Sequence, residues 1–246
     1  MQSSMDASTN DFLENCYDKA DWFFTQIVHA TFKSFLCWFM SSTSANGFLG
    51  RGSMFVMSTN QLLQLMGANS SWRAQSLLDL GAGDGRVTQQ MAPLFTDIYC
   101  TETSSPMQWR LNQCGYKILG VDEWHNGTQK YDLVSCLNLL DRCKQPATML
   151  RNIKDALVPE TGRLLLATVI PFEPYVEADT VDHTPSEFFH IEGRTFEEQV
   201  NSMVRNVFEP AGFVLERFTR VPYLCEGDLH QSIFWLDDAL FLLRSR

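Results

Sequence analysis

Leu-Leu-Asp-Leu-Gly-Ala-Gly-Asp-Gly, residues 77–85, is the most informative stretch of this sequence. A short apolar run, typical of a buried strand, leads directly into the glycines, and residues 85–94 then carry apolar side chains at helical spacing. A strand that turns through glycines into a helix is the nucleotide-binding unit of many α/β proteins. Because Gly81 and Gly83 have no Cβ, the backbone there can approach a ligand closely. We therefore expect a ligand site on this loop.

The residue types of the loop indicate which ligand it binds. Asp79 stands just before the glycines, and their spacing is Gly-x-Gly-x-Gly rather than the Gly-x-Gly-x-x-Gly of dinucleotide-binding proteins. A carboxylate would repel a pyrophosphate, but it would attract a ligand with a cationic centre. The sequence therefore predicts S-adenosylmethionine rather than NAD, with Asp79, Gly81 and Gly83 in its binding site.

Acidic residues after the next two expected strands match other parts of this ligand. Glu102 lies 23 residues after Asp79, where an acid accepts hydrogen bonds from ribose hydroxyls. Asp122 or Glu123, together with Trp124, follows the third expected strand. An adenine ring could be hydrogen-bonded and stacked there. We expect Glu102, Glu123 and Trp124 to bind the cofactor.

Strand-like and helix-like segments alternate from residue 76 onward. This alternation predicts a Rossmann-like α/β fold, a doubly wound and mainly parallel sheet whose last two strands form an antiparallel edge. The expected strands are 76–80, 97–102, 116–121, 131–137, 163–170, 212–220 and 232–244. The expected helices are one or two within 10–40, then 59–66, 85–94, 106–113, 147–157 and 195–208.

The first part of the chain has a different pattern. We expect residues 1–66 to form a helical segment that packs on a Rossmann-like domain of residues 67–246. Residues 22–40 are very apolar, but His29 and Lys33 interrupt them. This favours a buried helix over a membrane-surface helix, and we expect no membrane-spanning segment.

Composition and charge limit the possible partners. The 246 residues are 45 % hydrophobic and 20 % charged, which excludes disorder for most of the chain. With 19 basic and 29 acidic side chains the formal net charge is −10, and no basic cluster of the kind that binds nucleic acid is present. We therefore expect no nucleic-acid partner.

Cysteine and histidine usage indicates the compartment and argues against a metal. The seven cysteines are odd in number and include no Cys-x-x-Cys pair, which favours reduced thiols in an intracellular protein. We expect it in the cytoplasm or associated with the endoplasmic reticulum or mitochondria. The five histidines lack metal-ligand spacing, so we expect no metal site.

The fourth expected strand ends in Ser-Cys-Leu-Asn-Leu-Leu-Asp-Arg-Cys, residues 135–143. In doubly wound sheets, ligands bind outside the carboxyl ends of the strands. Asn138, Asp141 and Arg142 are therefore candidates for the reaction zone. A helix cap or a salt bridge is the alternative role for Asp141 and Arg142.

Several segments together resemble the DREV family of methyltransferases. They are the glycine loop and four further segments: Asn-Gly-Phe-Leu-Gly-Arg-Gly-Ser-Met-Phe-Val (46–56), residues 135–143, Pro-Phe-Glu-Pro-Tyr-Val-Glu (171–177) and Pro-Tyr-Leu-Cys-Glu-Gly-Asp (222–228). The glycine loop occurs in many methyltransferases, whereas segments 46–56, 135–143 and 222–228 are more specific. The resemblance extends from about Cys16 to Leu243.

This resemblance implies a seven-stranded class I fold, dependence on S-adenosylmethionine, and activity as a protein-L-histidine N-pros-methyltransferase. The implied substrates are histidine-rich proteins or peptides with His-x-His motifs. Two positions depart from the family pattern. Arg86 stands where family members carry an acid, and Leu-His-Gln-Ser-Ile-Phe-Trp (229–235) replaces a tyrosine-rich stretch.

The chemistry of imidazole then suggests roles for individual residues. Methylation at the pros nitrogen, Nδ1, needs its lone pair free and the proton on Nε2. We expect Asp141 to accept that N–H and to stabilise the developing imidazolium, with Tyr223 orienting the substrate. Asn138 is expected at both cofactor and substrate, and Arg142 at the substrate. Arg51 is expected to pair with the cofactor's carboxylate or with the peptide backbone.

Two other classes of function stay open at this point. A methyltransferase that acts on a small molecule or on another protein side chain would keep the same cofactor site. A catalytically silent interaction protein would fill the pocket without turnover.

Overall fold

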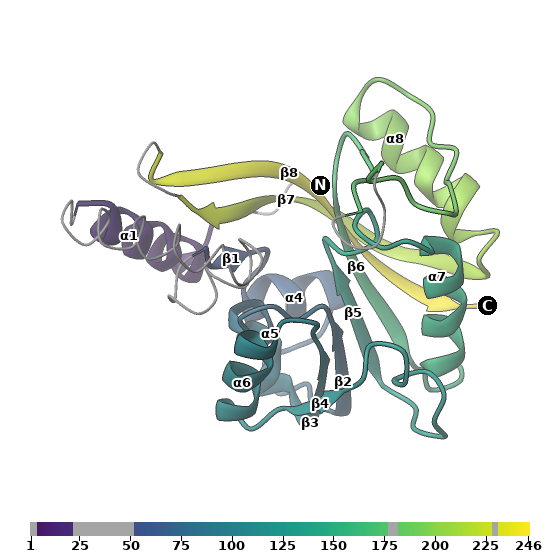
Figure 1. Ribbon diagram of the computed structural model, residues 1–246, viewed down its shortest axis with the longest axis horizontal. Coiled ribbons are helices and arrows are strands. Elements are labelled where there is room, and N and C mark those ends of the chain that lie inside the picture. The colour runs from purple at the N-terminus through teal and green to yellow at the C-terminus, as the bar shows by residue number, and fades with distance from the viewer. Residues whose placement is uncertain (1–3, 22–51, 177–181, 228–230) are drawn as a thin grey trace.

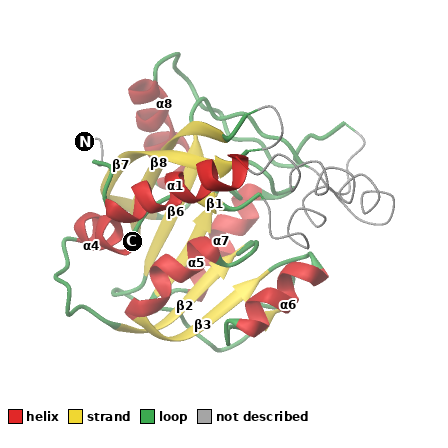
Figure 2. Ribbon diagram, turned by 90° about the vertical axis from the view of Figure 1, so that its left-hand side faces the viewer, coloured by secondary structure: helices red, strands yellow, loops and turns green. Residues whose placement is uncertain are grey.

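A mixed eight-stranded sheet runs through the protein, with helices on both of its faces (Figure 1, Figure 2). The computed structural model describes residues 4–21, 52–176, 182–227 and 231–246. Within these residues the strands are β1 (Met54–Phe55), β2 (Ala74–Leu80), β3 (Phe95–Thr101), β4 (Lys117–Leu119), β5 (Leu133–Leu137), β6 (Arg163–Val169), β7 (Phe213–Glu226) and β8 (Ile233–Ser245).

The strand order places the ends of β2 and β5 at the centre of the sheet. The order is β1-β7-β8-β6-β5-β2-β3-β4, with β2 to β6 parallel and β8 antiparallel to both β6 and β7. After β2 the chain moves to one side of the sheet, and from β5 it moves to the other. Ligands of doubly wound sheets bind at such a switch point.

The helices divide between the two faces of the sheet. They are α1 (Ala7–Asp21), α4 (Thr59–Met66), α5 (Arg86–Met91), α6 (Ser105–Gln113), α7 (Pro146–Ala156) and α8 (Phe196–Met203). Side chains of α4 and α5 join one hydrophobic cluster, and those of α7 and α8 join the cluster on the other face. Because both faces are covered, the central strands β5 and β6 consist mostly of apolar residues.

Strand β6 shows this arrangement residue by residue. Leu164 and Leu166 pack in the α7/α8 cluster, whereas Leu165 and Ala167 pack in the α4/α5 cluster. All four are fully buried, as alternation along a strand between two covered faces requires. The apolar run in the sequence therefore reflects burial on two sides.

The predicted class I Rossmann-like fold is confirmed, with three corrections to its elements. The sheet has eight strands rather than seven, because β1 pairs antiparallel with β7 at Met54–Cys225 and Phe55–Leu224. Strand β7 extends beyond the predicted end at residue 220, to Glu226. The last helix is α-helical only to Met203 and continues as a π-helix, Val204–Phe208.

The described part of the N-terminal segment packs against the sheet and α4. The ring of Phe12 stacks on Phe55 with 5.5 Å between centroids, and Lys19 Nζ lies 3.0 Å from Glu226 Oε2. Residues 22–51, which include the rest of the predicted helical segment and Arg51, lie outside the described residues. The division into 1–66 and 67–246 stays a prediction, although β1 already belongs to the sheet of the larger part.

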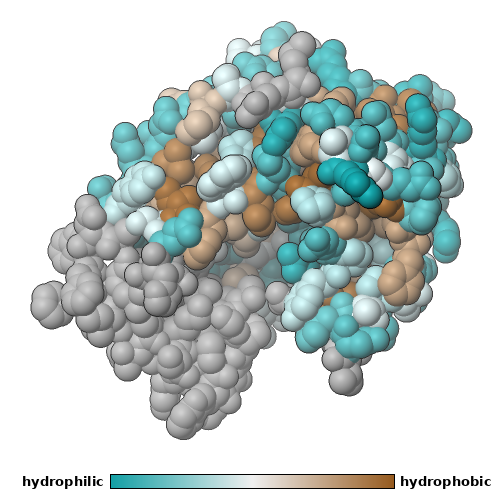
Figure 3. All heavy atoms as spheres, turned by 90° about the horizontal axis from the view of Figure 1, so that it is seen from above, coloured by the Kyte–Doolittle hydropathy of each residue, from teal (hydrophilic) through white to brown (hydrophobic). Residues whose placement is uncertain are grey.

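The β7–β8 hairpin projects from the helix-covered part of the sheet, and α1 lies along it (Figure 1). Phe234, Trp235 and Leu236 of β8 are exposed there. Figure 3 shows a band of hydrophobic side chains between hydrophilic ones on the face seen from above. In the described part of the chain, no helix is long and apolar enough to cross a bilayer, and no disulfide forms.

Ser58 joins the N-terminal segment to α4, and its removal tests that junction. Its Oγ accepts a hydrogen bond from Gln61 N–H at 3.0 Å and donates one to Asp6. We expect Ser58→Ala to lower the free energy of unfolding by about 1–2 kcal/mol, the usual cost of losing an N-cap. Urea unfolding measures this, with Ser71→Ala in an exposed turn as the control. Equal stability of wild type and Ser58→Ala would contradict the assignment.

Candidate cofactor and substrate site

The loop between β2 and α5 has backbone conformations that favour glycine. The φ angles of Gly81, Gly83 and Gly85 are +67°, +57° and +81°. A Cβ at Gly81 would lie 3.1 Å from a methyl carbon of Leu139, so the space is restricted as well. The predicted strand–glycine–helix unit is confirmed, and two separate constraints explain why glycine occupies the first position.

Asp79, at the end of β2, anchors this loop by accepting hydrogen bonds from two hydroxyl groups on neighbouring elements. Its buried carboxylate accepts hydrogen bonds from Thr88 Oγ1 of α5 at 2.6 Å and from Ser135 Oγ of β5 at 2.7 Å. Burial raises the pKa of Asp79 to about 6, and the two hydroxyl groups oppose that rise. These contacts tie β2, α5 and β5 together. Direct contact of Asp79 with the cofactor stays a prediction.

Glu102 lies against the same loop, immediately after β3. Its Oε2 accepts the Gly83 N–H at 3.0 Å, and its Oε1 accepts the Ser104 N–H at 2.8 Å. The carboxylate is therefore held over the glycines, at the strand end where a ribose would lie. It is only half-buried, so the oxygens can still accept from hydroxyl groups of a ligand.

The two residues predicted to contact adenine differ in their exposure to solvent. Glu123 is exposed, and its carboxylate folds back over Gly120. Trp124 is only 7 % exposed and packs in the α7/α8 hydrophobic cluster. That packing gives the Trp124 ring a structural role. Its stacking on adenine stays a prediction that this burial does not support.

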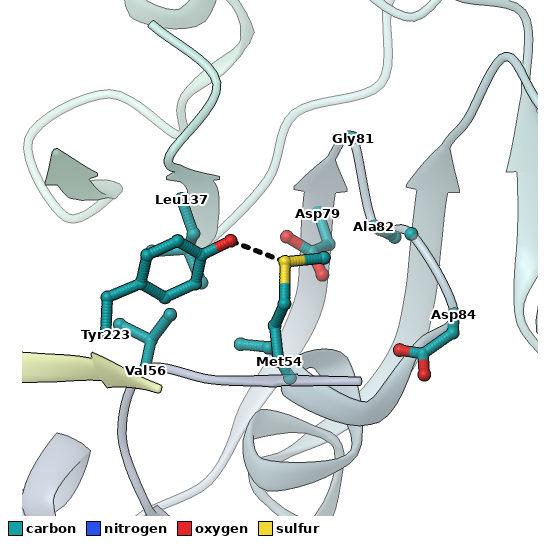
Figure 4. A pocket seen from close by; sticks show the side chains of 10 residues that line it. Met54, Val56, Asp79, Gly81, Ala82, Asp84, Leu137 and Tyr223 are labelled. Atoms are coloured by element: carbon teal, nitrogen blue, oxygen red, sulfur yellow. Dashed lines mark hydrogen bonds between the residues drawn. The ribbon is translucent and has the colours of Figure 1, made fainter. Parts of the chain in front are cut away.

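A pocket lies beside the glycine loop, at the ends of β2 and β5 (Figure 4). The Tyr223 hydroxyl points at the Met54 sulfur across this pocket, and Asp79 lies behind them. The pocket is open to solvent. The lining residues are Met54, Val56, Asp79, Gly81, Ala82, Gly83, Asp84, Val87, Leu137 and Tyr223.

A group of polar side chains lies next to the pocket, beyond the end of β5. Asn138 has a φ of +53° and donates from Nδ2 to Asp238 Oδ2 at 2.7 Å. Asp141 Oδ2 lies 3.1 Å from Arg142 Nε. Burial raises the pKa of Asp141, and the Arg142 guanidinium opposes this. Burial also raises the pKa of Tyr223, with the Asp238 carboxylate acting in the same direction.

Three buried acceptor oxygens in this group have no hydrogen-bond partner among the described residues. They are Asn138 Oδ1, Asp141 Oδ1 and Asp238 Oδ1. A buried polar atom without a partner costs about 1–3 kcal/mol, so each of these oxygens would gain from an N–H or O–H donor. The structure thus brings together Asn138, Asp141, Arg142 and Tyr223, as the sequence predicted, and adds Asp238.

Among the residues of the pocket and the polar group that were not predicted from the sequence are Met54, Val56, Asp84 and Asp238. Met54 and Val56 lie in segment 46–56, whose resemblance pointed to the region but not to these side chains. Asp238 follows Asp237 inside the otherwise apolar run of residues 233–243, and this pair of acids was the signal available in the sequence. Within the described residues, no group of three or more His, Cys, Asp or Glu could hold a metal ion.

The residues present fit S-adenosylmethionine. The glycines leave the loop backbone open to a ligand, Glu102 can accept from ribose hydroxyls, and Tyr223 and Met54 lie where the reactive end would meet the polar group. A bound cofactor would supply an electrophilic methyl group. Arg51, predicted at its carboxylate, lies outside the described residues.

Replacement of Glu102 tests the ribose assignment. We expect Glu102→Ala to weaken binding of S-adenosylhomocysteine by about 1.5–3 kcal/mol, because hydrogen bonds to a charged acceptor are lost. Isothermal titration calorimetry measures the change, and Glu209→Ala, at an exposed position just after the π-helix Val204–Phe208, is the matched control. An unchanged affinity in folded Glu102→Ala would rule out contact with the ribose.

The raised pKa of Asp79 predicts a specific pH dependence of stability. The folded state binds this proton more tightly than the unfolded chain does, with a pKa of about 6 against 3.8. Its contribution to stability is therefore fully present below about pH 4 and is lost as the pH rises through 6. Relative to Asp79→Asn, the wild type should lose free energy of unfolding between about pH 4 and 6 and then stay level. Urea titrations at each pH test this, and a pH-independent difference would contradict it.

Comparison with known proteins identifies the fold and the family. The model of the DREV methyltransferase family matches residues 1–245. A Pyrococcus horikoshii protein proposed to methylate RNA shares 11 % identity over 83 % of each chain, with a TM-score of 0.50. At such identity the likeness concerns the fold alone.

Two ligand-bound structures are also similar to this chain. The N-methyltransferase NodS from Bradyrhizobium japonicum, in complex with S-adenosylhomocysteine, shares 15 % identity over 76 % of this chain and 85 % of its own, with a TM-score of 0.47. Magnesium protoporphyrin IX methyltransferase from Synechocystis, with bound S-adenosylmethionine, shares 14 % identity over 76 % and 78 %, with a TM-score of 0.47. The predicted cofactor is confirmed by the family match, which covers nearly the whole sequence. The chain belongs to the DREV family of S-adenosylmethionine-dependent methyltransferases.

Proposed function

We propose that this methyltransferase transfers a methyl group to the pros nitrogen, Nδ1, of histidine in His-x-His segments of protein substrates. The observation that carries the proposal is the set of buried acceptor oxygens next to the cofactor pocket, Asn138 Oδ1 and Asp141 Oδ1 foremost. A substrate group that binds there has to bring hydrogen-bond donors. A neutral imidazole brings one N–H and, on the opposite side of the ring, one lone pair.

Acceptors at this place bind a neutral ring through its single N–H. If an acceptor holds the Nε2–H, the lone pair of Nδ1 is directed away from that acceptor and is free to react. A second donor on the ring would mean imidazolium, which has no lone pair and cannot be methylated. The proposal assigns the Nε2–H to these acceptors, so that the opposite nitrogen, Nδ1, keeps its lone pair and reacts.

Asp141 is the residue that this proposal places at the ring. One of its oxygens is paired with Arg142 and the other has no partner among the described residues, so a single oxygen is available for the Nε2–H. As the new N–C bond forms and the C–S bond to the methyl group breaks, positive charge develops on the ring. The Asp141 carboxylate stabilises this charge and accepts the Nε2 proton, which then passes to solvent. Its raised pKa suits an acceptor for that proton.

Arg142 and the loop after β6 suit recognition of the peptide. Arg142 is 43 % exposed, and its guanidinium lies 5.8 Å from the centroid of the Tyr175 ring. The Tyr175 N–H donates to the Asp141 carbonyl at 2.8 Å, so this loop lies directly over the candidate catalytic turn. The chain's charge of −10 also favours substrates that carry positive charge.

The experiment that tests this proposal is methyl transfer to a synthetic peptide with one His-x-His motif. Mass spectrometry locates the methyl group, and comparison with standards separates pros-methylhistidine from tele-methylhistidine. An Ala-x-Ala peptide and a panel of small amines serve as controls. Pros-methylhistidine in the His-x-His peptide alone is the expected result. Turnover of small amines, with the peptide left unmodified, would refute the proposal.

Asp141→Asn separates catalysis from cofactor binding. The amide keeps the shape but replaces a charged acceptor with a neutral one, and loss of such a group lowers turnover by about 10²–10³-fold. Affinity for S-adenosylhomocysteine should not change, because Asp141 is not among the residues that line the cofactor pocket. Turnover and calorimetry on the same preparation measure both. Near-normal turnover, or an equal collapse of cofactor affinity, would remove Asp141 from the catalytic role.

A further inference from the structure

The side-chain amide of Asn138 is held by an acid that comes 100 residues later in the chain. Asn138 Nδ2 donates to Asp238 Oδ2 at 2.7 Å, and the backbone N–H of Asn138 donates to the Ala167 carbonyl at 2.9 Å. Asp238 lies on β8, where it pairs in register with Val169 and Val221, and it is fully buried. The neighbouring strands β6 and β8 thus hold Asn138 at the end of β5.

This contact determines which end of the amide remains available. An asparagine amide has a donor end, Nδ2, and an acceptor end, Oδ1, and the two ends have nearly the same shape. The carboxyl oxygen Oδ2 of Asp238 accepts the Nδ2 hydrogen, so Oδ1 is the end that is left. This Oδ1 is one of the buried oxygens without a partner in the described part of the chain. Without Asp238, nothing in that contact would distinguish the two ends.

We propose that Asp238 is a positioning residue that holds the Asn138 amide with its oxygen available to the substrate's N–H, and that it thereby contributes to the choice of ring nitrogen. The inference rests on the proposed histidine methylation. When Asn138 Oδ1 and Asp141 Oδ1 accept the Nε2–H, Nδ1 keeps its lone pair and reacts. A reversed amide would present N–H donors instead; these bind the Nε2 lone pair and leave the proton on Nδ1, so that pros methylation slows.

Several titratable groups surround Asp238, so a substitution there has to separate loss of its charge from loss of its hydrogen-bond acceptor. The acids Asp141 and Asp237 and the side chains of Tyr223 and Cys225 interact with it electrostatically. Burial raises the pKa of Asp238 to about 8, and Asn138 opposes the rise. Even a protonated carboxyl group keeps an oxygen that accepts from Asn138 Nδ2. The holding contact therefore requires Oδ2 to stay an acceptor, as it does in the carboxylate and in the acid protonated on Oδ1.

A pair of variants separates the acceptor from the charge and from packing. Asp238→Leu fills the same space without an acceptor, in an apolar environment that includes Val221 and Leu240. Asp238→Asn keeps a carbonyl oxygen that can accept from Asn138 Nδ2. Asp237→Leu is the matched control, because Asp237 is the next residue and pairs with Arg220 at 2.6 Å. Thermal unfolding and affinity for S-adenosylhomocysteine confirm that each variant folds.

The assay uses the full chain and a His-x-His peptide, and measures kcat, KM and the ratio of pros to tele product. We expect Asp238→Leu to lower kcat about 10–100-fold, to change the peptide KM much less, and to raise the tele fraction, because the amide can then reverse. Asp238→Asn should restore most of the kcat and the pros selectivity, and Asp237→Leu should match the wild type.

Three results would overturn the inference. A wild-type product ratio and kcat in folded Asp238→Leu would show that the acid does not orient Asn138, while the proposed function would stand. An Asp238→Asn variant as impaired as Asp238→Leu would show that an acceptor at this position is not sufficient. A wild-type chain that leaves the peptide unmodified would remove the proposed function and, with it, this inference.

Discussion

Two hydrogen bonds to the buried carboxylate of Asp79 hold the site together. Thr88 and Ser135 donate to it from α5 and β5, so the glycine loop is fixed to the neighbouring strand as well as to its own helix. Burying an acid is costly, as its raised pKa shows, and the hydroxyl donors offset part of that cost. Because β2 and β5 flank the switch point of the sheet, fixing their ends positions the cofactor pocket and the polar group beyond β5 relative to each other.

The polar group beyond β5 depends on a different part of the sheet. The antiparallel strands β7 and β8 carry Tyr223 and Asp238 to the carboxyl end of β5, where Asn138 and Asp141 leave the sheet. A purely parallel sheet would place only strand ends and loops at this edge. The antiparallel hairpin instead places residues from the middle of long strands there, and such residues are held more rigidly than loop residues.

Much of this arrangement could be predicted from the sequence, because its causes are local. Buried parallel strands consist of apolar runs, and the positive φ angles of the loop require glycine, so both leave clear patterns. Pairings between distant residues leave no such pattern. The two-residue strand β1 exists only because it meets β7 about 170 residues later, and Asn138 meets Asp238 across 100 residues. Trp124 follows β4, where the sequence predicted an adenine contact, but tertiary packing buries its ring.

We propose that acceptor oxygens beyond β5 hold a substrate imidazole with its proton on Nε2. The most direct measurement is nitrogen NMR of a His-x-His peptide with labelled imidazole nitrogens, bound to the protein together with S-adenosylhomocysteine. The chemical shifts of the two ring nitrogens identify the tautomer without any turnover. We expect the target ring to bind with Nε2 protonated and Nδ1 unprotonated. A bound ring with the proton on Nδ1, or a doubly protonated ring, would contradict it.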